Sequence, residues 1–397
     1  MNRRIAGLLL ALFALPVCSL ASELIQFKDT TTSWANVLSI ASKEKKLIFL
    51  DAYTDWCSWC KVMDKETFTD SAVAKFMNEK FVPVKYEMET GFGAAMSAKY
   101  RVNAFPTFLI FTADGKLVNR ILGYRKSKEF LEKLAVALDP AKHDHLAGIS
   151  TALDPGFPEF YKQSFLKRET RQHPDSATVH AFLASAKDLT GEVAWSVMYR
   201  FSALLSKKYK DFIYQNYDRL KKMYGADDVE SSISLFLTFD LAGAIKTNDE
   251  SALERTMAAS QKYIDEPVSE MRLNYRMRFY RGTNRWTSFA DLIDSVKNSG
   301  DKLDENAMNS YCWAIYEKCD DKQVVARASK WMGDVVEKSP KYMILDTYAA
   351  LLFKNGELKK AKQYAELAIS TGKGDNEDVS ETESLIKKIN ASLERKP

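Results

Sequence analysis

Two cysteines separated by two residues are the side chains of this sequence best placed to do chemistry. Cys57 and Cys60 lie in the run DWCSWCK at 55–61, after an apolar segment at 47–53 and at the start of a segment with helical spacing. Free N–H groups and the dipole at a helix N-terminus favour a thiolate, which is the nucleophile of thiol–disulfide exchange. Cys60 lies about one helical turn further on, where it can attack a mixed disulfide formed at Cys57. The spacing therefore predicts a reactive dithiol.

A metal site and a structural role are the alternatives for such a pair. A structural zinc ion takes four ligands, usually from two cysteine pairs or from a cysteine pair and a histidine pair. The histidines of this chain all lie far from the two cysteines in sequence, at His143, His145, His173 and His180. We therefore expect no metal at this pair, and the predicted exchange chemistry needs no diffusible cofactor.

The segments around the dithiol indicate an α/β fold. Continuously apolar runs are typical of strands covered on both faces, apolar residues at helical spacing indicate amphipathic helices, and the turn residues at 113–116 predict a hairpin. The expected order is a short edge strand at 24–27, helix 33–44, strand 47–53, helices 57–66 and 71–80, strand 81–86, helix 92–100, strands 106–111 and 117–122, and helix 126–138. This order predicts an α/β sandwich around a mixed sheet.

Beyond residue 158 the strand pattern stops and helical spacing continues. Proline and glycine punctuate 139–158, and we interpret 141–158 as a linker. The expected helices are 160–170, 176–189, 193–224, 229–247, 251–264, 270–280, 286–297, 305–318, 322–337, 342–355, 358–370 and 380–393. Small residues and a glycine turn at 345–368 are similar to a tetratricopeptide repeat. We predict an all-helical, tetratricopeptide-like domain at 159–397.

The first residues have the pattern of an export signal. Two arginines precede an apolar stretch at 5–15 that is too short to span a bilayer, and residues 19–21 form a small-x-small cleavage site. We predict a signal peptide at 1–21 and a periplasmic or otherwise exported protein. The less favoured alternative is lipidation at Cys18, which would give peripheral membrane association.

Charge and cysteine content exclude two further classes of protein. A net charge of +4 over 397 residues, without a dense run of lysine and arginine, gives no reason to expect a nucleic acid partner. Five cysteines are too few for a disulfide-stapled exported scaffold. On one unbroken helix the Cα atoms of Cys312 and Cys319 would lie about 10 Å apart, beyond the roughly 7 Å limit for a disulfide. We interpret both as core thiols; the alternative is a helix break before Cys319 that allows a bridge.

Residues 25–138 resemble a thioredoxin-fold domain of the kind found in periplasmic disulfide-reductase systems. The resemblance rests on WC-x-x-CK at 56–61, an acid six residues before Cys57, a lysine in the following strand, a Phe-Pro-Thr loop and a glycine in the last strand. The last four features are Asp51, Lys85, Phe105-Pro106-Thr107 and Gly123. The resemblance implies a thioredoxin-like domain at 22–140, a redox-active disulfide Cys57–Cys60 and a cis peptide bond before Pro106.

The resemblance also implies which residues act. The catalytic residues would be Cys57, Cys60, Asp51 and Lys85, and the substrate-binding residues Trp56, Trp59, Phe105, Pro106 and Thr107. Burial in an apolar strand raises a carboxyl pKa, so Asp51 can take the proton of Cys60. The alternative is a structural acid paired with Lys85. In the family, main-chain groups before the proline pair with the bound peptide, which assigns that contact to Phe105.

The residues between the cysteines do not define the direction of exchange. Ser58 and Trp59 stand where common thioredoxins have Gly-Pro and strong oxidants have pairs with histidine. We favour an exported oxidoreductase that reduces protein disulfides, takes electrons from a membrane or periplasmic reductant and binds partners or substrates through its helical domain. The alternative is a helical-repeat adaptor whose thioredoxin-like module is structural or senses redox state.

Overall fold

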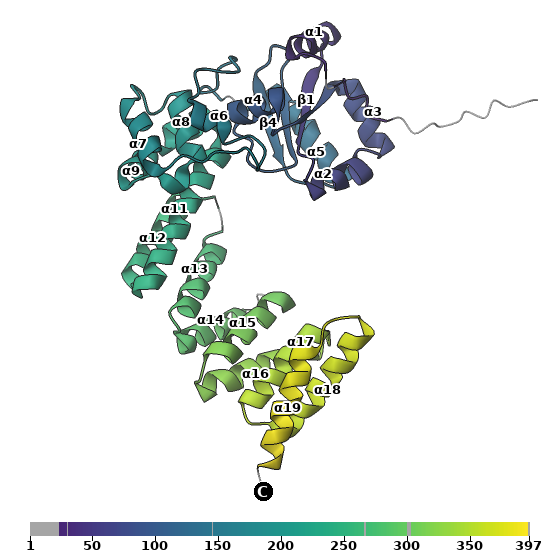
Figure 1. The fold of residues 1–397 in the computed structure, drawn as a ribbon, viewed down its shortest axis with the longest axis vertical. Coiled ribbons are helices and arrows are strands. Elements are labelled where there is room, and N and C mark those ends of the chain that lie inside the picture. Colours follow the sequence, from purple (N-terminus) through teal and green to yellow (C-terminus); the bar gives the residue numbers. More distant parts are fainter. Residues whose placement is uncertain (1–23, 30, 145, 266, 300–302, 396–397) are drawn as a thin grey trace, which may run out of the picture. The chain divides into compact units, whose positions relative to one another are not determined.

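The computed structural model describes residues 24–395 apart from 30, 145, 266 and 300–302 (Figure 1). It divides into two compact units, Met1–Ser232 and Ile233–Pro397. The predicted signal peptide, its cleavage site and Cys18 lie outside the described residues. The predicted boundaries of a linker at 141–158 and a separate domain from 159 stay a prediction.

A four-stranded mixed sheet forms the centre of the first unit. Its strand order is β2-β1-β3-β4. Strand β1 (Leu47–Tyr53) pairs in parallel with β2 (Phe81–Glu87) and antiparallel with β3 (Thr107–Phe111). Strand β4 (Leu117–Leu122) forms the predicted hairpin with β3. The strands expected from the apolar runs and the turn residues are confirmed.

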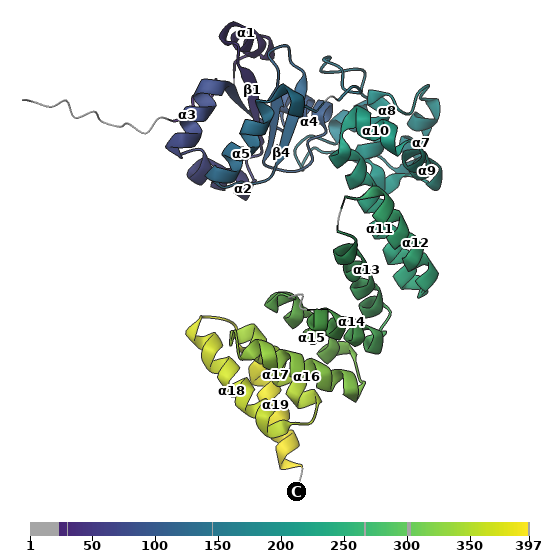
Figure 2. The same ribbon diagram turned by 180° about the vertical axis from the view of Figure 1, so that it is seen from behind.

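Helices cover both faces of this sheet (Figures 1 and 2). On one face, α1 (Trp34–Glu44) and α4 (Gly91–Tyr100) pack on a core that includes Val37, Leu50, Val84 and Met96. On the other face, α3 (Ser71–Lys80) and α5 (Ser127–Ala137) pack on a core that includes Phe49, Met77, Phe108 and Phe130. Alternate residues of a strand point to opposite faces, so Phe49 and Leu50 of β1 enter different cores. The α/β sandwich is confirmed.

The edge strand expected at 24–27 is absent from the sheet. Residues 24–29 are extended coil beside β2, where the N–H of Lys28 donates to the carbonyl of Pro83 over 2.9 Å. A paired strand would need a returning N–H donor from β2, and proline has none. The prediction of a strand here is therefore wrong.

Short helices complete the first unit. They are α6 (Glu159–Gln163), α7 (Ser176–Ser185), α8 (Glu192–Arg200), α9 (Lys207–Gln215), α10 (Tyr217–Tyr224) and the start of α11 (Ala226–Thr247). The continuous helix predicted at 193–224 is wrong. Helix α8 ends at its C-cap Phe201, where φ is −113° and ψ is 33°, and a 3-10 turn follows at Ser202–Leu204. The chain is then extended at Leu205 and Ser206 before α9 begins.

Buried ion pairs join these helices to the sheet. The carboxylate of Asp228 in α11 receives Arg101 Nε at 2.7 Å and Arg120 Nη1 at 2.8 Å, and the Lys99 ammonium pairs with Glu192. Arg101 and Asp228 are both fully enclosed. Removing one partner of a buried pair leaves an uncompensated charge, which is strongly destabilising. The sheet and the helices up to residue 232 are therefore one structural unit.

The second unit consists of helices throughout its described part. After α11 come α12 (Glu250–Tyr263), α13 (Val268–Gly282), α14 (Trp286–Ser299), α15 (Glu305–Lys318), α16 (Lys322–Val336), α17 (Tyr342–Lys354), α18 (Leu358–Gly374) and α19 (Ser380–Glu394). The predicted helical region is confirmed. Helices α17 and α18 meet through small residues, among them Ala349, Ala361 and Ala365, and the chain turns at Gly356 with φ +82°. The tetratricopeptide assignment stays a prediction.

Cys312 and Cys319 are buried in one apolar cluster of the second unit and carry free thiols. Helix α15 ends at Lys318, and Cys319 follows it in extended conformation. The interpretation as core thiols is confirmed, although the helix stops one residue before Cys319. No helix within the described ranges has both the length and the apolar character needed to cross a membrane.

Candidate active site

The two cysteines of the CxxC run form a disulfide at the start of a helix. Cys57 is the N-cap of α2 (Ser58–Val62), and its Sγ accepts the N–H of Cys60 over 3.1 Å. The Cα atoms of the pair lie 5.3 Å apart, and each residue is 4% exposed. Helix α2 continues into a π-helical turn at Met63–Thr67. A thiolate at Cys57 is favoured here because the N–H groups and the dipole of the helix start point at it.

Strand pairing places an acid and a lysine side by side near this helix. Asp51 of β1 lies opposite Lys85 of β2, and Lys85 Nζ is 3.2 Å from Asp51 Oδ2. Asp51 is almost fully buried, and its Oδ1 has no hydrogen-bond partner among the described residues. Burial raises the pKa of Asp51 to about 6, against the lowering effect of the Lys85 charge. This carboxyl therefore titrates near neutral pH, as a proton acceptor should.

A second carboxylate, which the sequence analysis did not identify, completes this group. Asp64 Oδ1 lies 2.5 Å from Lys85 Nζ, so the ammonium bridges two carboxylates. Burial alone would lower the pKa of Lys85, but Asp51 and Asp64 outweigh it and raise that pKa. The available signal was the spacing: Asp64 follows Cys60 by four residues and so shares its side of the helix.

The loop before β3 lies beside the end of β1. The Phe105–Pro106 peptide bond is cis, as the resemblance implies, and the register pairs Thr107 with Ala52 of β1. The loop is fixed by the Thr107 hydroxyl, which donates to Ala104 O over 2.7 Å, and by the Gly123 N–H, which donates to Pro106 O over 2.8 Å. In the described part of the chain, no hydrogen bond uses the N–H or the C=O of Phe105.

Two exposed tryptophans each precede a cysteine of the disulfide in sequence, Trp56 before Cys57 and Trp59 before Cys60. Trp56 is 64% exposed and Trp59 is 57% exposed. The Trp56 ring meets Phe105 edge to face at a centroid distance of 5.8 Å, and the Trp59 ring lies 5.4 Å from that of Tyr124. Exposed aromatic surface of this kind is typical of interaction sites. The structure thus brings Trp56 together with Phe105, and places Trp59 against the segment after β4.

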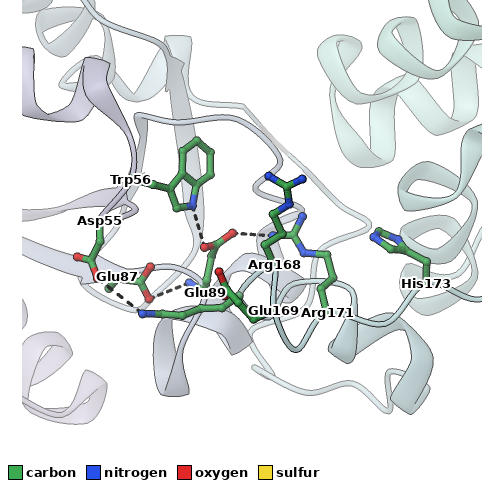
Figure 3. Close-up of a pocket in the computed structure, with 9 residues that line it drawn as sticks. Asp55, Trp56, Glu87, Glu89, Arg168, Glu169, Arg171 and His173 are labelled. Carbon is green, nitrogen blue, oxygen red and sulfur yellow. Dashed lines mark hydrogen bonds and ion pairs between the residues drawn. The ribbon is translucent and has the colours of Figure 1, made fainter.

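The indole of Trp56 is held by a contact that the sequence analysis missed. Its Nε1 donates to Glu89 Oε2 over 2.9 Å, and the other oxygen of Glu89 receives Arg171 Nη2 at 2.6 Å (Figure 3). Glu89 is only 5% exposed. Glu89 follows β2 and Arg171 lies after α6, so nothing in the local sequence pattern relates the two residues.

No group of three or more histidine, cysteine, aspartate or glutamate residues within the described ranges could hold a metal ion.

Comparison with known proteins defines the class of this domain. Residues 34–137 match the family model described as a thioredoxin-like domain. The chain is 31% identical over 117 residues to the thiol:disulfide interchange protein DsbD of Pasteurella multocida, which is 28% of this chain and 20% of that protein. The protein of the same name from Actinobacillus pleuropneumoniae is 32% identical over 98 residues, or 24% and 17% of the two chains. The chain thus spans about a fifth of the length of these relatives.

Solved structures also match part of the chain. A candidate disulphide-isomerase from Bacteroides thetaiotaomicron is 36% identical, with 30% of this chain and 97% of that chain covered and a TM-score of 0.28. The oxidised C-terminal domain of DsbD from Neisseria meningitidis is 26% identical, with 28% and 96% covered and a TM-score of 0.24.

The sheet, its two helical layers and the CxxC disulfide make this part of the chain a thioredoxin-like domain. DsbD proteins are its relatives at low identity, and an all-helical region follows it in this chain.

Proposed function

We propose that this chain is an exported thiol–disulfide oxidoreductase that reduces disulfides of proteins through Cys57 and Cys60. The observation that carries the proposal is the position of Cys57: its sulfur is the N-cap of α2 and receives the Cys60 N–H. Export rests on the predicted signal at 1–21. The proposed substrates are protein disulfides.

In the first step, the thiolate of Cys57 attacks one sulfur of the substrate disulfide. A bond forms between this sulfur and Cys57 Sγ, the substrate S–S bond breaks, and the other substrate sulfur leaves as a thiolate that takes a proton from water. The N-terminal end of α2 stabilises the attacking thiolate. The product is a mixed disulfide between Cys57 and the substrate.

In the second step, Cys60 resolves the mixed disulfide. The ionised carboxylate of Asp51 accepts the thiol proton, since its Oδ1 is buried without a partner in the described structure and its pKa of about 6 lies near neutrality. The Cys60 thiolate then attacks Cys57 Sγ, the mixed disulfide breaks, and the second substrate thiolate leaves and is protonated. The substrate has gained two electrons and two protons, and Cys57–Cys60 is the disulfide.

The substrate chain is held beside the disulfide by the loop before β3. The open N–H and C=O groups of Phe105 pair with the main chain of the substrate, as in β-augmentation. Pro106 and Thr107 fix this loop, and the exposed rings of Trp56 and Trp59 contact substrate side chains. The positive charge of Lys85 lowers the pKa of Asp51 against the effect of burial. More of the Asp51 carboxyl is therefore ionised than burial alone would allow.

A new cycle requires a dithiol donor, which we propose to be a membrane or periplasmic reductant. The direction of exchange is tested by the reduction potential of the Cys57–Cys60 couple, measured against glutathione in the full chain. A reductase is expected near the value of thioredoxin, about −270 mV. A value near that of strong oxidants, about −120 mV, would reverse the proposed direction.

Trapping tests the roles of the two sulfurs. The Cys60→Ser variant should accumulate a mixed disulfide with a protein disulfide probe such as insulin, because resolution is blocked after the first step. The Cys57→Ser variant is the matched control and should accumulate none. Equal trapping by both variants would contradict the assignment of Cys57 as the nucleophile. No exchange by the wild type would instead favour the adaptor function, with a structural or redox-sensing thioredoxin-like module.

A further inference from the structure

A cleft of about 700 Å³ lies on the side of Trp56 in the first unit (Figure 3). One wall belongs to the thioredoxin-like domain, and the other is the chain segment that follows α6. The lining residues are Asp55, Trp56, Glu87 and Glu89 on the first wall and Lys167, Arg168, Glu169, Arg171 and His173 on the second. Trp56 lines this cleft and directly precedes Cys57 of the disulfide in the chain.

The second wall is fixed against the first by arginine contacts. Arg171 donates from Nε to Leu166 O over 2.9 Å and from Nη2 to Glu89 over 2.6 Å. Arg200 of α8 binds Ser164 at both its hydroxyl and its carbonyl, and also binds Asn103 in the loop before Phe105. The cleft is therefore a formed feature of the first unit.

The cleft is lined by both negative and positive side chains, and several of them are available to an occupant. Four carboxylates and three cationic side chains line the cleft. Arg171 is paired with Glu89, and Lys167 Nζ lies 3.7 Å from Asp55 Oδ2. Among the described residues, Arg168 and Glu169 have no hydrogen bond or ion pair, and the buried Oε1 of Glu87 has no hydrogen-bond partner. The cleft thus offers both donors and acceptors to an occupant.

This chemistry fits a polypeptide better than a small ion. A peptide main chain presents N–H donors and C=O acceptors in alternation, whereas a small anion would meet the carboxylates and a small cation the arginines. The volume lies within the roughly 300–1,000 Å³ range of ligand pockets, which is room for a few residues. The indole of Trp56 supplies apolar contact at the end nearest the disulfide.

We propose that this cleft binds the polypeptide that flanks the reacting disulfide of a protein substrate, with Arg168 as a contact residue and Arg171 as a positioning residue. The inference rests on the proposed function and adds a second substrate-binding surface to it, one wall of which is formed by residues outside the thioredoxin-like domain. It makes the site selective for disulfides within polypeptides over small disulfides.

The positioning role follows from a chain of contacts. Arg171 holds the buried carboxylate of Glu89, Glu89 holds the Trp56 indole, and Trp56 meets the ring of Phe105 edge to face. Without Arg171, the Glu89 carboxylate loses its ion pair and the indole loses its fixed acceptor. Trp56 would then leave the orientation in which its ring packs against Phe105.

The test compares two substrates in the full chain. Prereduced protein is mixed with excess insulin or excess glutathione disulfide, and the rate of Cys57–Cys60 disulfide formation is measured by acid quench and thiol labelling. Arg168→Ala and Arg171→Ala should each lower the rate with insulin by about tenfold, as expected for the loss of one hydrogen bond to a charged group. The rate with glutathione disulfide should stay within about twofold of wild type, because this substrate has no flanking polypeptide to occupy the cleft. Arg171→Ala should also shift the Trp fluorescence of the reduced protein.

Controls separate the possible failures. Arg276→Ala, which removes an arginine paired with Glu254 in the second unit, should leave both rates unchanged. Equal losses with both substrates would show general damage to the site and would overturn the cleft proposal, as would unchanged rates with insulin for Arg168→Ala. If wild-type protein reduces neither substrate, the proposed function itself fails.

Discussion

Lys85 Nζ lies 3.2 Å from the buried Oδ2 of Asp51, its direct neighbour across the parallel pair β1–β2. The ammonium also contacts Asp64 at 2.5 Å. Because burial still outweighs the positive charge, the pKa of Asp51 is raised to about 6. At pH 7 the carboxyl is therefore mostly ionised, while a modest fall in pH protonates it. Stability and rate should both respond to this titration.

Asp51→Asn should stabilise the first unit at high pH. The folded protein holds the Asp51 proton more tightly than the unfolded chain, whose value is 3.8, so the favourable contribution of this group is present below about pH 4 and is lost as the pH rises through 6. Asparagine avoids this loss and should add about 3 kcal/mol to the free energy of unfolding at pH 8. The gain should vanish below pH 4.

Pulse proteolysis in urea, with β1 and β2 peptides identified by mass spectrometry, measures this free energy. The exposed Asp211→Asn change, which removes a surface pair with Lys207, is the control and should alter stability by less than about 1 kcal/mol at either pH. A destabilised Asp51→Asn protein at pH 8 would show that the ion pair with Lys85 outweighs burial.

The same substitution should slow resolution by Cys60. A positioned general base contributes about 100-fold or more to such a step, so Asp51→Asn should release glutathione from a preformed Cys57 mixed disulfide about 100-fold more slowly. The wild-type rate should fall as the pH drops below 6, because a protonated Asp51 accepts no proton. The variant should lack this break in its pH profile. Identical profiles would assign Asp51 a structural role.

Removal of Asp228 should destabilise the whole first unit. Asp228→Ala leaves the guanidinium of Arg101 buried without its ion-pair partner, and Nη1 and Nη2 of Arg101 already lack hydrogen bonds among the described residues. The expected cost is about 3–5 kcal/mol in the free energy of unfolding, again by pulse proteolysis. Glu254→Ala, at an exposed pair of the second unit, should cost less than about 1 kcal/mol.

The contribution of the Asp228 ion pairs to the free energy of unfolding should depend on pH. Burial alone would raise the pKa of Asp228, but Arg120 and Arg101 outweigh it and hold that pKa below 3.8. Their contribution is therefore present above the unfolded value and is lost as the pH falls below it. In acid, the difference between wild type and Asp228→Ala should shrink; a difference that is constant down to pH 2 would contradict an ionic origin.

Alkylation should distinguish the two kinds of cysteine. After reduction of the native protein, iodoacetamide should label Cys57 and leave Cys312 and Cys319 unmodified until urea is added. The latter two are fully buried, and burial raises the pKa of each thiol, so little thiolate forms. Peptide mass spectrometry measures the labelling. Rapid native labelling of Cys312 would show that α15 and α16 open readily.

The sequence was informative where neighbours in space are also related by a repeating pattern. Apolar runs defined β1 and β2, and the parallel register then put Asp51 beside Lys85. The four-residue spacing from Cys60 could also have indicated Asp64. It was missed because Lys85 already had one acidic partner, Asp51, in the prediction. The helix predicted at 193–224 was wrong because the spacing of its apolar residues does not mark the breaks at 201–206 and at Asn216.

Long-range polar pairs were beyond that reasoning. Glu89 and Arg171 are 82 residues apart, and Arg101 and Asp228 are 127 apart. The sequence does not distinguish a buried arginine from an exposed one. Long-range charged pairs also produce no periodic pattern along the chain. The second wall of the cleft beside Trp56 was therefore invisible, although the disulfide it adjoins was the first feature recognised.

The long sequence separation of Arg101 and Asp228 determines when their ion pair can first form during synthesis. Asp228 is synthesised 127 residues after Arg101, which at about 5–20 residues per second is a delay of roughly 6–25 s. Throughout that interval both cysteines of the CxxC pair already exist, while Arg101, joined by Arg120 after 19 more residues, has not yet met Asp228. The two ion pairs can therefore form only after α11 has been synthesised, long after the last strand of the sheet.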